Sequence, residues 1–371
     1  MPYIESLRHI MRNSMGITYC MWFKNGLFMS MLESNNRWGP PFLLSDMATA
    51  DFSAVMDEEE SISTVFVDYS GRLLLIRACE EKKEPMVLLE SRIVGSAPYN
   101  VCLLSANEQS HVFYTVSHNR KQLLTYQRVE GSSFSMPEVM GVVVRESKNY
   151  AACTEGSNLH LFFITDIQDV SLIVHRKIGS DGKPLKPNSS PFPHKAAKRL
   201  QSVCAKDGII YVLASGDEGD NTVLYRFDTI GCKFSKGLEV YTPSTGPGFD
   251  SLLLINNSPA VVRTCKSEFI LSRIKPDATE VLDETRIDLN NRDSIQRCVY
   301  LSNHKDDRGF KAYEIPVVLG NGLRFPFDWR TLASTRFDKA DDEKTKLKER
   351  ILDLEGRVAF LESTIREMLR P

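Results

Sequence analysis

The sequence lacks the long apolar run that a membrane-spanning helix needs. Its apolar stretches, such as Leu73 to Ile76 and Leu161 to Ile164, are far shorter than the roughly 20 residues that cross a bilayer. Residues 1–12 alternate polar and apolar side chains and do not form the apolar core of a secretory signal. The net charge of -2 provides no general attraction to nucleic acid or to an anionic membrane. We therefore expect a cytoplasmic protein that binds neither.

Motifs for catalysis and metal binding are also absent. The chain has no H-E-x-x-H, no C-x-x-C pair, no phosphate-binding glycine loop and no nucleophile elbow. The acidic turn at 215–221 offers oxygen ligands without the alternating spacing of a calcium loop, which favours a solvated turn. Most of the eight cysteines lie inside apolar runs, as buried free thiols of a reducing compartment do. We expect no cofactor, no metal and no catalytic residue of a recognisable type.

What the sequence does contain is internal repetition. Gly131-Ser132-Ser133-Phe134-Ser135 is matched by Gly231-Cys232-Lys233-Phe234-Ser235, two repeat units further on. A third copy is recognisable in Arg37-Trp38-Gly39-Pro40. Each unit is about 50 residues long, which is the length of a four-stranded propeller blade.

Strand-like runs repeat with the same period. Seven runs that we assign as third strands recur at this spacing, and most follow another apolar run that ends in a turn. The pattern predicts an all-β, seven-bladed propeller over residues 1–330. The seventh unit lacks a run for its outermost strand, so we expect Pro2 to Leu7 to complete it and close the ring. The runs are Leu27 to Leu32, Leu73 to Arg77, Leu123 to Val129, Ser171 to Lys177, Val223 to Phe227, Phe269 to Ile274 and Leu323 to Phe327.

The cysteines support this register. Cys102, Cys153 and Cys204 follow one another at equal intervals of one unit, and Cys298 lies about two units further on. All four fall in the first strand of their unit. We interpret them as small apolar side chains that pack between the innermost strands, and not as nucleophiles.

Two hairpins share an aromatic residue, a small residue, any residue and then proline: Trp38-Gly39-Pro40-Pro41 and Phe134-Ser135-Met136-Pro137. They resemble the hairpins of sialidase-type propellers, although the Ser, Asp and Gly of the Asp box are not in order. The resemblance implies a propeller fold. A sialidase would also need an arginine triad, a tyrosine nucleophile and an acidic partner, and the sequence identifies none of them.

The C-terminal residues show a different period. After a polar linker at 331–342, the apolar positions of residues 343–371 step alternately by three and four, as in a parallel coiled coil. A helix folded back on its own domain is the alternative, and Leu352 and Phe360 at outward positions favour it. The heptad residues are Leu347, Ile351, Leu354, Val358, Leu361, Ile365 and Met368.

Two consecutive Arg-to-Glu segments bear on the number of strands. Arg350 to Glu355 and Arg357 to Glu362 resemble the trimerisation signature of short three-stranded coiled coils, in which the arginine pairs with the glutamate of a neighbouring strand. Isoleucine at a with leucine at d favours two strands instead. We therefore expect a homotrimer, with a dimer as the alternative.

These features favour a non-enzymatic, homotrimeric binding module whose propellers bind an unknown protein or glycan with avidity. An intracellular scaffold is the first alternative. The second is a glycan-processing enzyme whose acid and base come from distant blades. The turns between second and third strands form the candidate ligand face, with Arg72, His118, Arg120, Asp166, Asp169, Asp217 and Asp220.

Overall fold

The computed structural model divides into two compact units, Met1–Phe327 and Asp328–Pro371. It describes residues 7–77, 85–90, 97–145, 148–167, 170–179, 184–185, 192–193, 198–205, 208–215, 222–241, 249–264, 268–288, 295–320 and 322–324. The residues predicted to form the coiled coil lie outside these ranges. Within them there is no α-helix, and no helix is long and apolar enough to cross a membrane.

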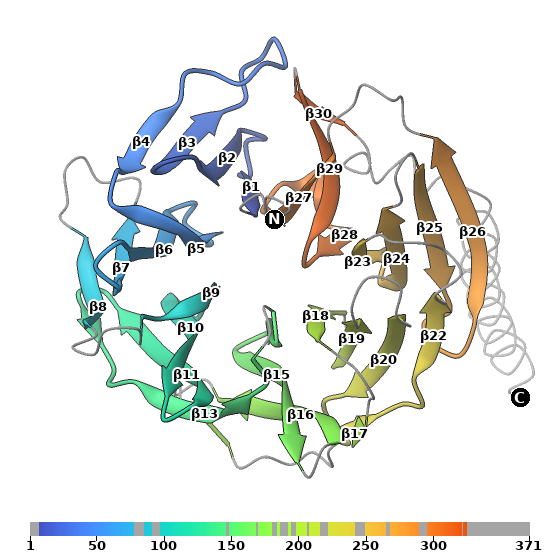
Figure 1. Ribbon diagram of the computed structural model, residues 1–371. Helices are drawn as coiled ribbons and strands as arrows, with labels where there is room; N and C mark the ends of the chain where they lie inside the picture. The colour runs from blue at the N-terminus through green and yellow to red at the C-terminus, as the bar shows by residue number, and fades with distance from the viewer. Residues whose placement is uncertain are drawn as a thin grey trace, which may run out of the picture. The chain divides into compact units, whose positions relative to one another are not determined.

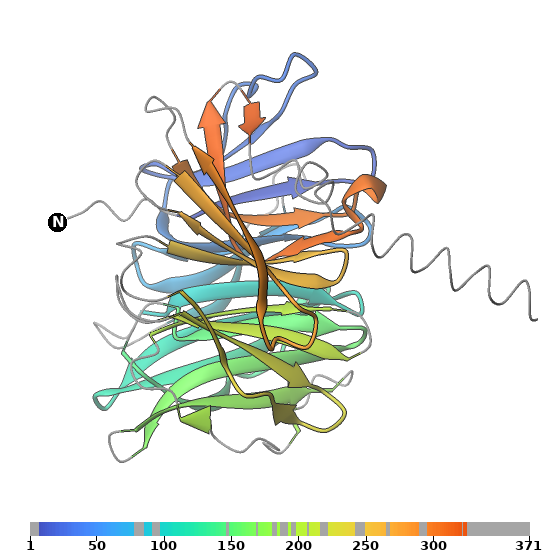
Figure 2. The same cartoon turned by 90° about the vertical axis from the view of Figure 1, so that its right-hand side faces the viewer.

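The described chain forms a ring of six sheets around a central channel (Figure 1). The strands of each sheet run between the two faces of the ring (Figure 2). Each blade is a chain of antiparallel neighbours, from an innermost to an outermost strand. The first four blades contain β1 (Arg8–Arg12), β2 (Thr18–Phe23), β3 (Leu27–Met31) and β4 (Phe42–Ser45); β5 (Ala48–Met56), β6 (Ile62–Asp68), β7 (Arg72–Arg77) and β8 (Met86–Glu90); β9 (Tyr99–Ala106), β10 (Gln109–His118), β11 (Lys121–Glu130), β12 (Ser133–Phe134) and β13 (Glu138–Val143); and β14 (Tyr150–Glu155), β15 (Asn158–Ile167), β16 (Val170–Ile178) and β17 (Phe192–Pro193).

The fifth and sixth blades complete the ring. The fifth contains β18 (Arg199–Cys204), β19 (Ile209–Ser215), β20 (Thr222–Asp228), β21 (Lys233–Phe234) and β22 (Leu238–Tyr241). The sixth contains β23 (Phe249–Ile255), β24 (Ser258–Thr264), β25 (Glu268–Ile274) and β26 (Val281–Asp288), together with β28 (Phe310–Ala312). The last strands are β27 (Ile295–Ser302), β29 (Ile315–Gly320) and β30 (Gly322–Arg324), and a 3-10 turn, η2 (Lys305–Asp307), follows β27.

The prediction of seven blades is wrong. Strands β27, β29 and β30, which belong to the seventh repeat unit, form no sheet of their own but extend the sheet of the first blade to seven strands. The reason is that β27 pairs in parallel with β1, from Arg8 opposite Cys298 to Arg12 opposite Ser302. Both strands begin at the same face, so they run in the same direction when they meet.

The ring closes at its inner edge. The first described strand, β1, is an innermost strand, and it meets β27 near the channel (Figure 1). This closure pairs β1 with β27, so the edges along which they meet are not exposed to pairing with another chain. We expected Pro2 to Leu7 to add an outermost strand to the last blade, but residues 2–6 lie outside the described residues.

The blades pack face to face through apolar side chains. Each interface from blades one and two to blades five and six has a buried cluster, such as Phe162, Phe227 and Tyr225 between blades four and five. The two matching sequence segments form equivalent hairpins in blades three and five. Ser135 Oγ accepts a hydrogen bond from the Arg128 backbone N–H at 2.9 Å, and Ser235 Oγ accepts one from the Arg226 backbone N–H at 3.0 Å. The repeated serine therefore fastens the hairpin between the third and outermost strands.

Candidate functional site

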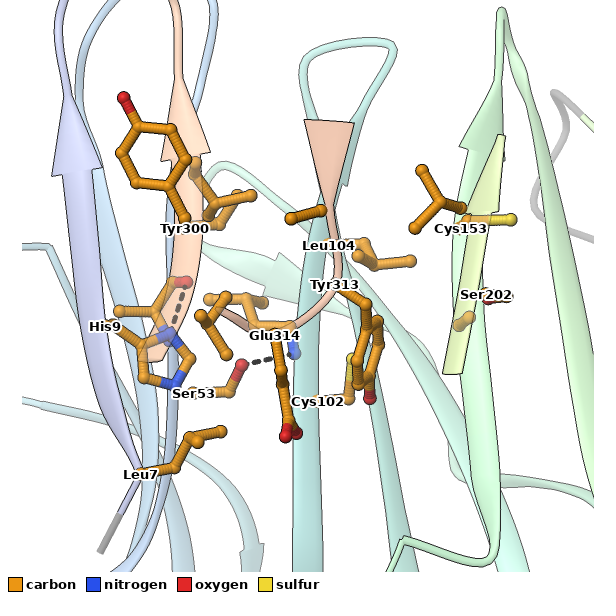
Figure 3. A pocket seen from close by; sticks show the side chains of 18 of the residues that line it. Leu7, His9, Ser53, Cys102, Leu104, Cys153, Ser202, Tyr300, Tyr313 and Glu314 are labelled. Carbon is orange, nitrogen blue, oxygen red and sulfur yellow. Dashed lines mark hydrogen bonds between the residues drawn. The ribbon is translucent and has the colours of Figure 1, made fainter. Parts of the chain in front are cut away.

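A cavity of about 400 Å³ lies inside the channel. Residues 303–314, which we call the plug segment, connect β27 to β29. The wall of the cavity is built by the innermost strands and by Phe310 to Glu314 of the plug segment. We call the face where the innermost strands begin the entry face, and the opposite one the exit face. The turns between second and third strands lie on the entry face. Figure 3 shows the cavity; its apolar lining includes Phe52, Val101, Leu104, Val203, Leu301 and Phe310.

The plug segment runs along the channel. Its strand β28 pairs antiparallel with β23, with Phe310 opposite Ile255 and Ala312 opposite Leu253. Since β23 runs from the entry face to the exit face, the plug segment runs back from the exit face towards the entry face. It therefore narrows the channel of this propeller along one side.

A buried carboxylate fastens the plug segment near the exit face. Asp307 Oδ2 accepts hydrogen bonds from Arg12 Nη1 at 3.0 Å, from the Tyr300 hydroxyl at 2.8 Å and from the Ser302 hydroxyl at 2.7 Å. The donors come from the ends of β1 and β27. This carboxylate thus joins the plug segment to the point where the ring closes.

A second buried carboxylate fastens the other end. Glu314 is paired with Lys148, which precedes β14, and with Arg297 in β27, whose Nε lies 3.1 Å from Glu314 Oε2. Burial alone would raise the pKa of Glu314, but the two cations outweigh it and hold the pKa well below its ordinary value of 4.5. Burial lowers the pKa of Lys148 to about 7, against the opposing effect of Glu314.

Apart from Lys148, Glu314 and Lys311, the polar groups of the cavity wall are uncharged. Burial raises the pKa of the Cys102 thiol to about 12 and that of Cys204 to about 11, so both stay protonated near neutral pH. Burial also lowers the pKa of His9 to about 4, and its Nδ1 lies 3.2 Å from the Ala54 carbonyl oxygen. Ser53 Oγ accepts from the Leu103 backbone at 3.0 Å. Figure 3 shows His9 and Ser53 side by side on the same part of the wall.

Hydrogen bonds about one repeat apart join neighbouring innermost strands. The Asn100 backbone donates to Asp51 Oδ1 at 3.0 Å, and Asn100 Nδ2 donates to Asn149 Oδ1 at 3.1 Å. Gln201 links in the same way to Asp250 and Leu252. Because these strands do not share a backbone ladder, these side chains hold the channel wall in register.

The cysteines were placed correctly by the sequence. Cys102, Cys153, Cys204 and Cys298 all lie on innermost strands, and the first three line the cavity. The six described cysteines are free thiols. Two histidines of second strands, His111 in β10 and His160 in β15, are buried.

The described residues of the predicted ligand face lie outside the cavity. Arg72, His118, Arg120 and Asp166 are at or beside turns between second and third strands, and none of them lines the cavity. Arg72 is paired with Asp68 at 2.7 Å, and Asp166 accepts from Ser171 Oγ at 2.6 Å. Asp169, Asp217 and Asp220 lie outside the described residues, as do the predicted oligomerisation residues at 347–368. Within the part of the chain that the structure describes, no cluster of three metal-ligating side chains occurs.

Sequence reasoning missed Glu314, Lys148 and Arg297. One signal could have found the plug segment: the connection between the first and second strands of its unit, at 303–314, is more than twice as long as the same connection in any of the six blades. The long insertion also makes the last repeat, from Phe269 to Leu323, the longest of all.

The fold and the cavity define an all-β, six-bladed propeller with a partly filled channel. No family model and no curated protein matches the chain. Several solved structures are similar to the chain. A six-bladed fungal lectin of Aleuria aurantia is 9% identical to it in sequence, with a TM-score of 0.49, and the match covers 77% of this chain and 96% of the lectin. A puromycin-hydrolysing peptidase of Mycobacterium tuberculosis is 12% identical, with 83% and 51% covered and a TM-score of 0.46. A subtype N10 neuraminidase-like protein of a little yellow-shouldered bat influenza A virus is 9% identical, with 69% and 85% covered and a TM-score of 0.43. Values this low carry no argument about the function of this chain.

Proposed function

We propose that this protein is a non-enzymatic binding propeller that engages a protein or glycan partner on its entry face. The single observation that carries the proposal is the plug segment, which occupies part of the channel and is fastened by Asp307 and Glu314. Because the plug segment narrows the channel, a large partner would contact the turns on the entry face and not the inside of the channel.

The state of the channel also bears on the enzyme alternative. Most glycoside hydrolases place two carboxyl groups on either side of the scissile bond. Among the described residues that line the cavity, Glu314 is the only carboxylate, and it is neutralised by Lys148 and Arg297. The arrangement therefore gives the glycan-processing alternative less support than the binding module. An intracellular scaffold differs from the binding module only in its partner.

The entry face carries residue types that dominate binding interfaces. Tyr69, in the turn between β6 and β7, is 61% exposed, and Arg120, in the turn between β10 and β11, is exposed as well. Arg72 follows Tyr69 in the same hairpin and is held in place by Asp68. Tyrosine and arginine are enriched among the side chains that contribute most to binding energy. We place the contact surface on these two neighbouring blades.

The double variant Tyr69→Ala with Arg120→Ala is expected to bind its partner about 30-fold more weakly, since losing interface hot spots costs about 2 kcal/mol or more. The partner is sought on a glycan array and by pull-down from native extract, and affinity is measured by biolayer interferometry. Phe134→Ala is the matched control, because Phe134 is 45% exposed on the outer hairpin of blade three. Equal binding by the double variant, or hydrolysis of a glycoside panel by the wild-type protein, would contradict the proposal.

We further propose that the chain forms a homotrimer through residues 347–368. Light scattering is expected to give three times the chain mass of 42.0 kDa. Ile351→Asn, at an expected core position, should reduce the mass to that of one chain, whereas Leu352→Asn, at an expected outward position, should leave it unchanged. A twofold mass would indicate the dimer, and a wild-type mass equal to that of one chain would exclude self-association.

A further inference from the structure

The cavity wall contains a buried hydroxyl that lacks a strong protein partner. Ser202, on β18, is 2% exposed, and within the described part of the chain its Oγ has no hydrogen bond of normal geometry. The Cys153 thiol lies close enough to interact with the Ser202 side chain, and a thiol is a weak hydrogen-bonding group. Buried hydroxyls are normally satisfied, because leaving one without a partner costs free energy. A ligand that offers an acceptor or a donor at this point would remove that cost.

Other groups of the wall retain hydrogen-bonding capacity. Ser53 Oγ accepts a hydrogen bond from Leu103, so its own hydrogen is left to donate. His9 uses one ring nitrogen on the Ala54 backbone, and the rest of the ring forms part of the wall. All three side chains line the cavity from three different strands, and Figure 3 shows Ser202 across the view from His9 and Ser53. A few polar groups converging from separate elements on an apolar space are typical of a small-molecule site.

The size of the cavity fits such a molecule. Its volume of about 400 Å³ falls within the range of about 300–1,000 Å³ of ligand pockets. Between the polar groups the wall is apolar, with Phe52, Leu104 and Val203 among its side chains. Apolar cavities hold water poorly and take up apolar molecules instead. The body of the ligand is therefore apolar.

The charged groups of the cavity wall are Lys148, Glu314 and Lys311. The Glu314 carboxylate is paired with both Lys148 and Arg297, so neither sign is left uncompensated at that end. Lys311 Nζ donates to the Cys204 carbonyl at 3.1 Å, and its side chain is exposed towards the exit face. His9 and the thiols are uncharged. An ion in the apolar middle of the cavity, away from these three charged groups, would lose its hydration without gaining a counter-ion.

We propose that the central cavity binds an uncharged, largely apolar small molecule that carries at least one hydrogen-bonding group and reaches Ser202. This site is separate from the partner surface on the entry face and does not depend on it. The ligand lies between the plug segment and the innermost strands of blades one to five. The bound ligand contacts Ser202 and the apolar side chains of the wall, which the plug segment leaves in contact with the cavity.

A pair of dyes that differ by one charged group tests the class of ligand. N-phenyl-1-naphthylamine is neutral and apolar with one N–H, and 1-anilinonaphthalene-8-sulfonate is the same molecule with a sulfonate. The neutral dye is expected to bind the full-length protein with one saturable site and at least tenfold more tightly than the sulfonate. Absence of saturable binding of the neutral dye, or equal affinity for both dyes, would overturn the proposal.

Two cavity-filling variants test the location. Cys102→Phe and Leu104→Phe each add volume to a partly exposed wall residue. Each substitution is expected to weaken binding of the neutral dye at least tenfold. Phe134→Ala, on the outer rim, should change its affinity less than twofold. Near-ultraviolet circular dichroism confirms that each variant is folded. Unchanged dye affinity in a folded cavity variant would place the dye elsewhere and refute the assignment.

A measurement on the wild-type protein needs no substitution. Alkylation by N-ethylmaleimide, read by peptide mass spectrometry, compares Cys102 in the wall with Cys232 on the outer hairpin of blade five. Saturating neutral dye is expected to slow alkylation of Cys102 at least fivefold and to leave Cys232 unaffected. Equal protection of both cysteines, or of neither, would contradict binding in the cavity.

Discussion

Glu314→Gln is expected to destabilise the protein by about 3 kcal/mol, because it removes the charge at the centre of a buried ion-pair network. The side chain of Glu314 is 1% exposed and its carboxylate is the shared partner of Lys148 and Arg297. Glutamine keeps the shape but removes the charge, so the two cations remain in a partly buried site without a counter-ion. Removing one member of a buried ion pair costs about 3–5 kcal/mol, and we take the lower end because both cations retain some exposure. Urea unfolding at pH 7 measures the loss.

The same substitution should loosen the plug segment before the propeller unfolds. Hydrogen exchange is expected to rise in residues 310–314, while the ladder between β10 and β11 stays protected. Asp277→Asn is the matched control, because Asp277 forms an exposed ion pair with Lys275 and should leave the urea midpoint unchanged. A midpoint for Glu314→Gln equal to that of the wild type would show that the buried pair does not stabilise the fold.

The repeat period was enough to predict most strands. Each third-strand run found in the first six units corresponds to an observed strand, from β3 in blade one to β25 in blade six. The register of Cys102, Cys153 and Cys204 also predicted which strands surround the channel. Local patterns of this kind succeed because alternation and turn residues act over a few positions.

The number of blades could not be predicted in the same way. Whether the seventh unit keeps its own sheet depends on β27 meeting β1, a contact between residues at opposite ends of the propeller sequence such as Arg8 and Cys298. No local pattern encodes a pairing over that distance. The Glu314 site is missed for the same reason, since Arg297 and Glu314 come from the last unit and Lys148 comes from the link before β14, about three units earlier.

Buried histidines give the second large effect, a loss of stability on mild acidification. Burial lowers the pKa of His9 and His111 to about 4 and that of His175 to about 3; burial also lowers the pKa of His160, although Glu155 opposes it. In the unfolded chain each titrates near the ordinary value of 6.5. The unfolded chain therefore binds more protons between about pH 6.5 and 4, and the free energy of unfolding falls as the pH falls through that range.

Each such histidine contributes a slope of about 1.4 kcal/mol per pH unit. The protein is therefore expected to lose several kcal/mol between pH 7 and pH 5, measured as the free energy of unfolding in urea at each pH. His175→Phe should reduce the slope, because the phenyl ring fits against Phe162 and Phe227, whose centroids lie 5.0 Å and 4.3 Å from the imidazole. Phe134→Ala, which changes an exposed side chain that does not titrate, should leave the slope unchanged.

The pH windows separate the two effects. Because the folded pKa of Glu314 is held below 4.5, its stabilisation is complete above about pH 4.5 and is lost only as the pH falls further. Glu314→Gln should therefore lower the whole curve at neutral pH but flatten it below about pH 4.5, whereas His175→Phe should flatten it between about pH 6.5 and 4. A wild-type curve that stays level from pH 7 to pH 5 would show that the histidines are protonated in the folded protein, and the buried chain from Glu155 through His160 to His175 would then carry a positive charge.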